Sequence, residues 1–319
     1  MILITGGLGF LGCNLARLLC ETGEEVLLTM NRSREVPSFL SSYVDKNLKL
    51  ISLDITSLEA LDDALQEFGV NAIVHAAVRS EKGNTTLYQA MNVNVTGTVN
   101  VLEAAHRAGV QRVIFISSEA VYQGMPDTVP FKEEERLLVS SDRFIPGSKK
   151  AGEILGHLYG SIHGLDVISV RMTRAYGPLY QGIRNLAGLM LEQAAKGKAV
   201  HLENNDPGEA HDIVYVKDVA KGVRLLLKAT ALSHRIYNLG SGRLTTLGEF
   251  AEAIEKFLPA AEIHLGDGPG PLISTKTPMD INTCVDISRL RNETGFTPEY
   301  DPYRGTEHYI NWARHGTYT

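Results

Sequence analysis

Residues 1–12 read MILITGGLGFLG, and this stretch decides the fold. Its apolar run Ile2–Thr5 predicts a buried strand, and the glycines that follow predict a tight turn into a helix. Gly7, Gly9 and Gly12 satisfy the spacing GxGxxG, which lets a backbone turn sharply and approach a pyrophosphate. The stretch therefore predicts a dinucleotide-binding turn whose anion meets the free N–H groups at the helix start. The alternative is a glycine-rich turn without a ligand.

Short apolar runs alternate with longer helical patterns over the first half of the chain. The expected strands are Ile2–Thr5, Glu25–Thr29, Leu48–Leu53, Ala72–His75, Val113–Ser117 and Val167–Arg171, and the expected helices are Leu11–Thr22, Leu58–Phe68, Thr98–Ala108 and Lys149–His163. This alternation predicts a parallel sheet with helices on both faces, which is the Rossmann-type, doubly wound α/β fold.

The pattern becomes mixed after Arg171, where polar loops separate shorter elements. Strands are expected over Ile213–Val216 and Ile236–Leu239, and helices over Ile183–Lys196, Asp218–Lys228 and Leu247–Phe257, with Asp218 as an N-cap. We expect a dinucleotide-binding domain over residues 1–174, to which residues 212–242 return. A smaller mixed lobe over residues 175–319 is expected to bind the substrate.

The residues after the second expected strand bear on the choice of nucleotide. The chain has Asn31, Arg32 and Arg34 where an acidic residue would bind the ribose 2′-hydroxyl of NAD. The two arginines would attract the 2′-phosphate of NADP, so NADP(H) is the expected cofactor and NAD the alternative. They could also be a solvated loop face. After the third strand, Asp54 could bind the adenine amino group or cap the helix that begins near Ser57.

Composition limits the partners and the compartment. The 319 residues carry a net charge of −6 with no basic run, which argues against a nucleic-acid partner. No apolar run approaches the roughly 20 residues of a membrane helix. The N-terminal stretch lacks the pattern of a signal peptide, and the three cysteines have no metal-binding spacing. We expect a cytoplasmic protein without a metal.

Further motifs follow the opening turn in one order along nearly the whole chain. They are Val74–Ala77, Asn94–Thr98, Ile116–Ser118, Val121-Tyr122, Ser148–Glu153, Arg171 with Tyr176–Pro178, His211–Val216 with Asp218–Ala220, and Tyr237–Gly242. With these motifs the chain resembles the extended short-chain dehydrogenase/reductase family, especially its nucleotide-sugar epimerases and dehydratases. The resemblance implies a cofactor held by Gly6, Gly9, Phe10, Leu11, Gly12, Asn31, Arg32, Arg34, Asp54, Ile55, Ala76, Ala77, Asn94 and Lys149.

The resemblance also implies hydride exchange between a nicotinamide and a carbinol carbon. A serine or threonine hydroxyl binds the reacting oxygen, a tyrosinate takes its proton, and a lysine four residues later lowers the tyrosine pKa and holds the ribose. Ser118 matches the hydroxyl and Lys149 matches the lysine, but Ile145 occupies the tyrosine position. Isoleucine cannot transfer a proton, so another group must do so or the reaction must differ.

Two residues are candidates to replace the missing phenol. Glu119 follows Ser118 and matches the acid with which sugar 4,6-dehydratases expel a hydroxyl, although their adjacent glutamate is Ala120 here. The alternative for Glu119 is a residue at the rim of the site. Tyr122 matches a family tyrosine near the substrate, with packing as its favoured role. The candidate catalytic residues are Ser118, Glu119, Tyr122 and Lys149.

A second departure concerns the substrate. Relatives that bind sugar nucleotides usually have an arginine, which holds a phosphate, where His211 stands. Arg174 replaces an asparagine of many relatives, and Arg79 follows the Val-His-Ala-Ala motif. Either arginine could bind a carboxylate or phosphate through two hydrogen bonds, or could form a surface or structural ion pair. With Tyr176, these residues form the candidate substrate set.

Three interpretations of function remain open. The leading one is a nicotinamide-dependent oxidoreductase, epimerase or dehydratase that acts on a sugar nucleotide or another anionic polyol, with an acid or base other than tyrosine. A non-redox lyase or isomerase on the same fold is the second, and a catalytically silent NADP(H)-binding regulator is the third. Retention of Ser118 and Lys149 argues against the third. The resemblance also implies a homodimer through helices over Thr86–Ala108 and Lys149–His163.

Overall fold

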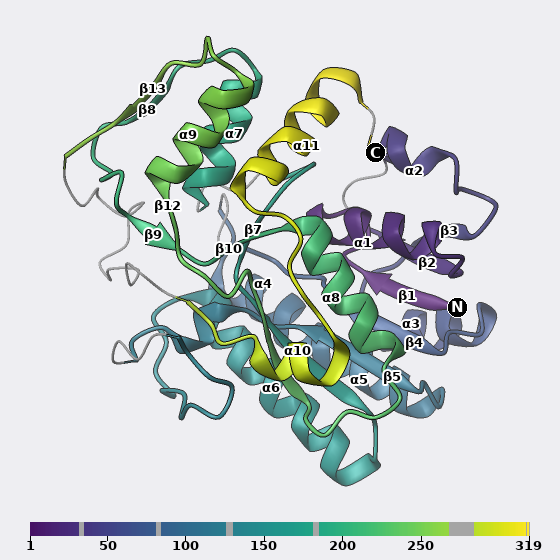
Figure 1. Ribbon diagram of the computed structural model, residues 1–319. Helices are drawn as coiled ribbons and strands as arrows, with labels where there is room; N and C mark the ends of the chain where they lie inside the picture. The colour runs from purple at the N-terminus through teal and green to yellow at the C-terminus, as the bar shows by residue number, and fades with distance from the viewer. Residues whose placement is uncertain are drawn as a thin grey trace.

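The computed structural model describes residues 1–31, 35–80, 84–125, 130–180, 185–267, 284–316 and 318. Its centre is a seven-stranded sheet in which all pairings are parallel (Figure 1). In spatial order the strands are β11 (Ile236–Leu239), β6 (Val167–Met172), β5 (Arg112–Ile116), β4 (Ala72–His75), β1 (Ile2–Thr5), β2 (Val26–Met30) and β3 (Leu48–Ser52). The predicted Rossmann-type α/β fold is confirmed.

The strand order reverses between β1 and β4, and this reversal positions the site. β1 pairs with β2 on one side and with β4 on the other. The chain therefore continues from β1 toward one edge of the sheet and from β4 toward the other edge. Ligands of open parallel sheets bind outside the carboxyl ends of the strands at such a switch point. The glycine turn follows β1 and Ala76 follows β4, so both lie there.

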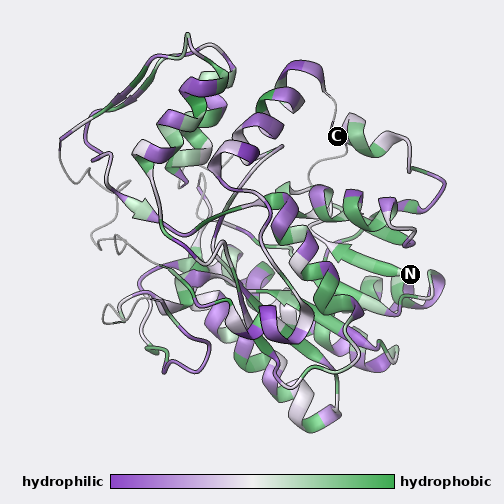
Figure 2. Ribbon diagram, viewed as in Figure 1, coloured by the Kyte–Doolittle hydropathy of each residue, from purple (hydrophilic) through white to green (hydrophobic). Residues whose placement is uncertain are grey.

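The sheet divides the core into two halves because neighbouring strand residues point to opposite faces. Ile2 and Ile4 pack with α1 (Phe10–Glu21) and α8 (Val216–Lys228), whereas Leu3 packs on the other face. Strands buried on both faces are mostly apolar, as their colour in Figure 2 shows. The other face is covered by α3 (Leu58–Glu67), α5 (Gly97–Arg107) and α6 (Phe144–His163).

A smaller lobe has its own core above the main sheet in the view of Figure 1. Its helices are α7 (Leu186–Ala195), α9 (Leu247–Phe257) and α11 (Pro302–His315). Short strand pairs join β7 (Arg174–Tyr176) to β10 (Ile213–Tyr215), β9 (Ala210–His211) to β12 (Thr245–Thr246), and β8 (Val200–Leu202) to β13 (Ile263–Leu265). Within the described ranges, no helix is long and apolar enough to cross a lipid bilayer.

The chain returns from the smaller lobe to the main sheet. β11 pairs with β6 and forms one edge of the sheet, and α8 packs beside α1. After a further excursion, α10 (Ser288–Thr294) packs against β11 and α8. Residues 212–242 contain both α8 and β11, whereas a division of the chain at residue 174 stays a prediction.

Three predicted helix starts differ from the structure by two or more residues. α7 begins at Leu186, after its N-cap Asn185, and not at position 183. α6 begins at Phe144 and not at Lys149, because Pro146 lies in the first turn, where a missing N–H costs no intrahelical hydrogen bond. α8 begins at Val216, so Asp218 lies within its first turn and is not the cap. The Asp218 carboxylate instead accepts two backbone N–H groups, at 2.9 Å each, from the segment that precedes α11.

Candidate active site

The turn after β1 brings backbone to the switch point. Gly6 has a φ of +68°, and a Cβ there would lie 2.8 Å from the Cα of Ala77, just beyond β4. The Gly6 N–H donates to the Thr29 hydroxyl of β2 at 3.1 Å. Only glycine fits this position, since side chains avoid this φ and backbone already fills the space.

The first backbone N–H groups of α1 have no side-chain cap. Gly9 is its N-cap and offers no side chain to them, and no acidic residue stands in the first turn. A Cβ at Gly12 would clash with the Gly7 carbonyl oxygen, so the helix can follow the turn this closely only with glycine. The amides of Phe10 and Leu11 stand at the positive end of the helix dipole. This cradle fits a pyrophosphate.

A hydrogen-bond chain fixes the end of β4 beside this turn. The Ala77 N–H donates to the Thr5 hydroxyl at 3.2 Å, and that hydroxyl lies 2.7 Å from His75 Nδ1. His75 Nε2 lies 2.9 Å from the Thr98 hydroxyl, which donates to the Asn94 carbonyl oxygen. Because the Thr98 proton is already used, His75 carries its proton on Nε2. Burial lowers the pKa of His75 to about 3, so the ring is neutral and structural.

Asn94 joins the loop after β4 to the helical layer. It lies in the π-helix η1 (Asn92–Thr96). Its side chain accepts the Arg79 N–H at 2.7 Å and donates to the Arg79 carbonyl oxygen at 3.0 Å and to the Ser148 hydroxyl at 3.4 Å. The Arg79 guanidinium donates to Gln89, while its buried Nε has no partner among the described residues. The predicted cofactor residue Asn94 and substrate residue Arg79 thus lie together.

Residues expected at the adenosine end follow β2 and β3. Asn31 is exposed after β2, and Arg32 and Arg34 lie outside the described residues. Asp54 follows β3, and its Oδ1 accepts two hydrogen bonds within its own turn, at 2.9 Å each. Ile55 is buried. The cap of α3 is the serine at position 57, so Asp54 does not cap that helix.

Lys149 lies one helical turn after Ile145 and reaches the end of β5. Its Nζ donates to the Ile116 carbonyl oxygen at 2.5 Å and lies 4.9 Å from the centre of the Phe115 ring. Burial lowers the pKa of Lys149 to about 8, against the opposing effect of Glu153. The half-buried Ile145 has no proton to exchange. The lysine that the resemblance implies therefore reaches the end of β5, and hydrocarbon occupies the position of its expected phenol partner.

Tyr122 is held in a buried network. It ends the 3₁₀-helix η2 (Glu119–Tyr122), and its hydroxyl accepts from Arg171 Nη1 and donates to Asn238 Oδ1, both at 2.8 Å. Arg171 also pairs with Glu153 of α6 at 2.8 Å, and both side chains are at most 6% exposed. Burial raises the pKa of Tyr122 to about 12. These contacts favour packing as the role of Tyr122.

Glu119 follows Ser118, whose hydroxyl caps η2 by accepting the Ala120 N–H at 3.1 Å. Glu119 Oε1 lies 3.6 Å from Arg174 Nε of β7. Glu119 Oε2 and Arg174 Nη1 are buried, and neither has a hydrogen-bond partner in the described part of the chain. Burial raises the pKa of Glu119 to about 7, against the opposing effect of Arg174. Glu119 can therefore give or take a proton near neutral pH.

His211 of β9 is held by an acidic partner. Its Nε2 lies 2.9 Å from Glu209 Oε1, and the other Glu209 oxygen accepts from Asn205 at 2.9 Å. His211 Nδ1 is buried and has no partner within the ranges described. The charge of Arg174 affects the pKa values of Glu119, Glu209 and His211, so these groups are neighbours. The fold thus brings together the predicted residues Glu119, Arg174 and His211. Asn205 and Glu209 were not predicted, because neither belongs to a motif.

Tyr176 packs inside the smaller lobe. Its ring is 1% exposed and lies edge-on to Tyr215 and Phe250, with ring centres 4.9 and 5.1 Å away. Gly305 of α11 leaves room for the hydroxyl, since a Cβ there would clash with it. These contacts favour packing as the role of Tyr176, and its substrate contact stays a prediction.

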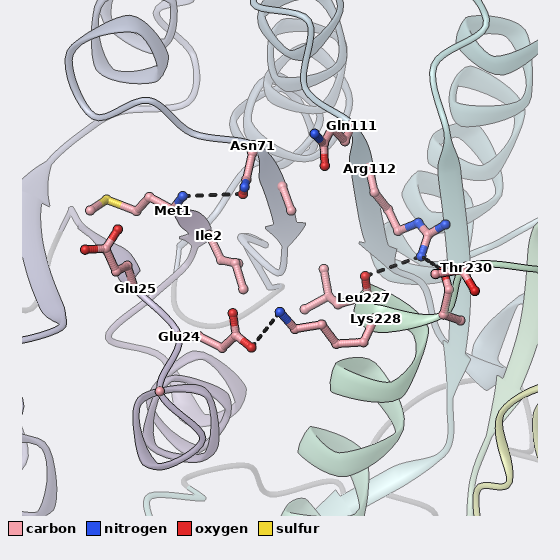
Figure 3. A pocket seen from close by; sticks show the side chains of 13 residues that line it. Met1, Ile2, Glu24, Glu25, Asn71, Gln111, Arg112, Leu227, Lys228 and Thr230 are labelled. Carbon is pink, nitrogen blue, oxygen red and sulfur yellow. Dashed lines mark hydrogen bonds and ion pairs between the residues drawn. The ribbon is translucent and has the colours of Figure 1, made fainter.

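A pocket of about 590 Å³ opens at the other end of the strands, where β1, β4 and β5 begin (Figure 3). Two of its charged side chains are paired: Lys228 contacts Glu24 and Arg112 contacts Asp166, each at 2.6 Å. Ligands of parallel sheets bind at the carboxyl ends of the strands, so this pocket is not the candidate site. Within the described ranges, no three His, Cys, Asp or Glu side chains are arranged to hold a metal ion.

Comparisons with known proteins agree with this geometry. The model of the NAD dependent epimerase/dehydratase family matches residues 2–240. A UDP-glucuronate 4-epimerase from Thermodesulfobacterium geofontis is 26% identical over 98% of this chain and 95% of its own length. A dTDP-glucose 4,6-dehydratase from Streptomyces niveus is 28% identical over 98% and 92%. The structure of Thermus thermophilus UDP-glucose 4-epimerase complexed with NAD has a TM-score of 0.81 at 26% identity and covers 99% of each chain.

Proposed function

The chain belongs to the NAD dependent epimerase/dehydratase family, and on this premise we propose that it epimerises or dehydrates a hydroxylated substrate, a sugar nucleotide or another anionic polyol, with Glu119 as its acid/base. It is an enzyme of the extended short-chain type. The observation that carries the proposal is the buried Glu119, whose pKa is raised to about 7 beside Ser118 and Arg174. With Ile145 at the tyrosine position, proton transfer needs such a group.

The cofactor is proposed from the glycine turn and its surroundings. The bare amides at the start of α1 support a dinucleotide, and NAD is bound in the Thermus relative. Arg32 and Arg34 favour NADP by charge, so we propose NADP(H), with NAD as the alternative. Changing both arginines to alanine should weaken NADP binding by about 10- to 100-fold and leave NAD binding within about threefold in calorimetry. Equal losses for both nucleotides would count against a 2′-phosphate contact.

The mechanism assigns a proton path to the protein's own residues. A nicotinamide dinucleotide, which the glycine turn, Asn94 and Lys149 would hold, would supply hydride exchange with a carbinol carbon. Ser118 can donate its hydroxyl to the reacting oxygen, and the Lys149 ammonium stabilises negative charge in its surroundings. As a carboxylate, Glu119 removes the hydroxyl proton; as a carboxylic acid, it protonates a departing hydroxyl, which leaves as water. Arg79, Arg174 and His211 are proposed to bind the substrate.

Glu119→Gln tests the proposal because it keeps the shape of the side chain and removes its proton exchange. Turnover of UDP-glucose, UDP-glucuronate and dTDP-glucose is followed by NMR. We expect kcat to fall by about 10²- to 10⁴-fold, while the protein still binds its dinucleotide. The wild-type rate should fall above about pH 7 if the acid form acts and below it if the carboxylate acts.

Tyr122→Phe is the matched control for that test. Its hydroxyl serves a buried network, so the variant should lose stability and keep kcat within about tenfold. Wild-type turnover by Glu119→Gln would refute the acid/base role. The reverse result, with Tyr122→Phe inactive and Glu119→Gln active, would move the role to Tyr122.

A non-redox lyase or isomerase is the second candidate, which Ile145 favours because it removes the usual alcohol base. Transient reduced nicotinamide, seen by absorbance after substrate is added to the holoenzyme, distinguishes the two. Hydride transfer predicts this signal. Product formation with solvent deuterium in the product and no such signal would favour the non-redox route.

The homodimer is proposed from the exposed face of α6. Ile154, Leu158 and Ile162 repeat every four residues and are 63%, 45% and 69% exposed. Residues at this spacing form one apolar stripe on a helix, which soluble proteins usually cover. The neighbouring α4 (Leu87–Met91) adds Tyr88, which is 81% exposed. A second copy of the chain would cover these residues.

A further inference from the structure

Three buried polar atoms around Arg174 have no hydrogen-bond partner among the residues described. They are Arg174 Nη1, Glu119 Oε2 and His211 Nδ1. Folded proteins pair the great majority of such atoms, so three in one electrostatically coupled group indicate a place for a polar ligand. The His211 side chain is 7% exposed, which leaves little room for bulk water to serve its free nitrogen.

Glu209, the hydrogen-bond partner of His211, determines whether His211 Nδ1 donates or accepts a hydrogen bond. The hydrogen bond from His211 lowers the pKa of Glu209, so Glu209 is a carboxylate and can only accept. His211 Nε2 therefore carries the proton of the 2.9 Å contact. Asn205 donates to the second Glu209 oxygen at 2.9 Å and fixes the carboxylate. Burial lowers the pKa of His211, so the ring is neutral and Nδ1 has only a lone pair.

We propose that Glu209 is a specificity-determining residue: it fixes His211 in the Nε2–H form, so that this part of the site binds a substrate hydroxyl and rejects a phosphate. A substrate hydroxyl can donate to the His211 Nδ1 lone pair, and Arg174, whose charge acts on His211, has an unpaired Nη1–H that can donate to a substrate oxygen. A phosphate oxygen carries only lone pairs, so the Nδ1 lone pair would repel it, and the nearby negative charge of Glu209 would add to that repulsion. The inference rests on the proposed function, because it takes these residues to bind the substrate.

The tautomer is read directly in the ¹⁵N-histidine NMR spectrum of the holoenzyme at pH 7.5, with His211→Phe to assign the signals. We expect a protonated Nε2 and an unprotonated Nδ1. In Glu209→Gln the amide can donate to Nε2 while its oxygen still accepts from Asn205, so the proton should move to Nδ1. A protonated Nδ1 in the wild type would overturn the proposal, and this spectrum decides even if the variant does not fold.

Binding of UDP, used as a phosphate probe, tests the consequence by calorimetry on the holoenzyme. We expect Glu209→Gln to bind UDP about tenfold or more tightly than the wild type, because Nδ1–H then donates to phosphate. The double variant Glu209→Gln/His211→Phe loses a charge but has no donor, so it should show at most a small part of that gain. An equal gain in both variants, or none in Glu209→Gln, would overturn the proposal.

The hydroxyl contact is tested with the nucleotide sugar that the enzyme turns over. The wild type should prefer it to UDP, and the preference should shrink about tenfold in Glu209→Gln, where Nδ1 no longer accepts. An unchanged preference would refute the hydroxyl contact. Absence of turnover by the wild-type holoenzyme would contradict the proposed function alone, since the NMR spectrum needs no substrate.

Discussion

At the scale of single residues, burial shifts the pKa values of His75 and Glu119 in opposite directions. It favours the neutral form of each, so the pKa of His75 falls to about 3 and that of Glu119 rises to about 7. Hydrogen bonding then separates their roles. Both ring nitrogens of His75 are used inside the protein, whereas Glu119 keeps an oxygen without a partner in the described chain. Of these two side chains, only Glu119 can exchange a proton with a substrate.

His75 should make the fold sensitive to acid. Its pKa is about 3 when folded and 6.5 in the reference state, so the folded state binds fewer protons and stability falls as pH drops from about 6.5 towards 3. Between pH 7 and pH 5 the free energy of unfolding should fall by about 2 kcal/mol more in the wild type than in His75→Gln, which cannot titrate. Urea unfolding at both pH values measures this. Equal losses would show that His75 does not have to remain neutral.

Some site residues were predictable because their chemistry is local. The glycines of the opening turn follow from a short motif, whereas the Ser118 and Lys149 positions follow from the resemblance to the family. Glu209 and Asn205 could not be found in this way, because their roles arise only when β9 and the loop before it fold against each other. The packed surroundings of Tyr176 could not be predicted either, because a turn motif does not show which side of the chain its ring faces.

At the scale of elements, predicted strand bounds differ from the structure by at most one residue at each end over the main sheet, because buried parallel strands are continuous apolar runs. Helix starts were less predictable. Pro146 extends α6 at its first turn, and Asp218 serves a distant segment instead of its own helix. Local sequence rules cannot see such long-range partners.

The exposed stripe of α6 gives a prediction for this element. Ile154→Lys combined with Ile162→Lys should convert a dimer into a monomer, because two lysines would be buried in the interface. Light scattering coupled to size exclusion measures the mass. Val139→Lys is the control, since Val139 is 97% exposed and lies outside α6. A wild-type monomer, or a double variant that remains dimeric, would contradict the proposal.

At the scale of the whole molecule, Asn14 ties the two lobes together. Its amide on α1 donates to the Phe10 carbonyl oxygen at 2.7 Å and to the Pro178 carbonyl oxygen at 3.0 Å. The Tyr318 hydroxyl donates to the Asn14 oxygen, so the last described residue reaches the same helix. The helix that would hold the pyrophosphate is therefore in direct contact with the turn that leads into the smaller lobe.

β11 completes the sheet from a point more than sixty residues after its neighbour β6, and this has a practical consequence for anyone who shortens the protein. A fragment ending at residue 174 would leave one rim of β6 with unsatisfied N–H and C=O groups, which invite strands from other molecules. We expect fragment 1–174 to aggregate and fragment 1–242, which regains β11 and α8, to scatter much less light at equal concentration. A monodisperse 1–174 would show that the sheet tolerates an open rim.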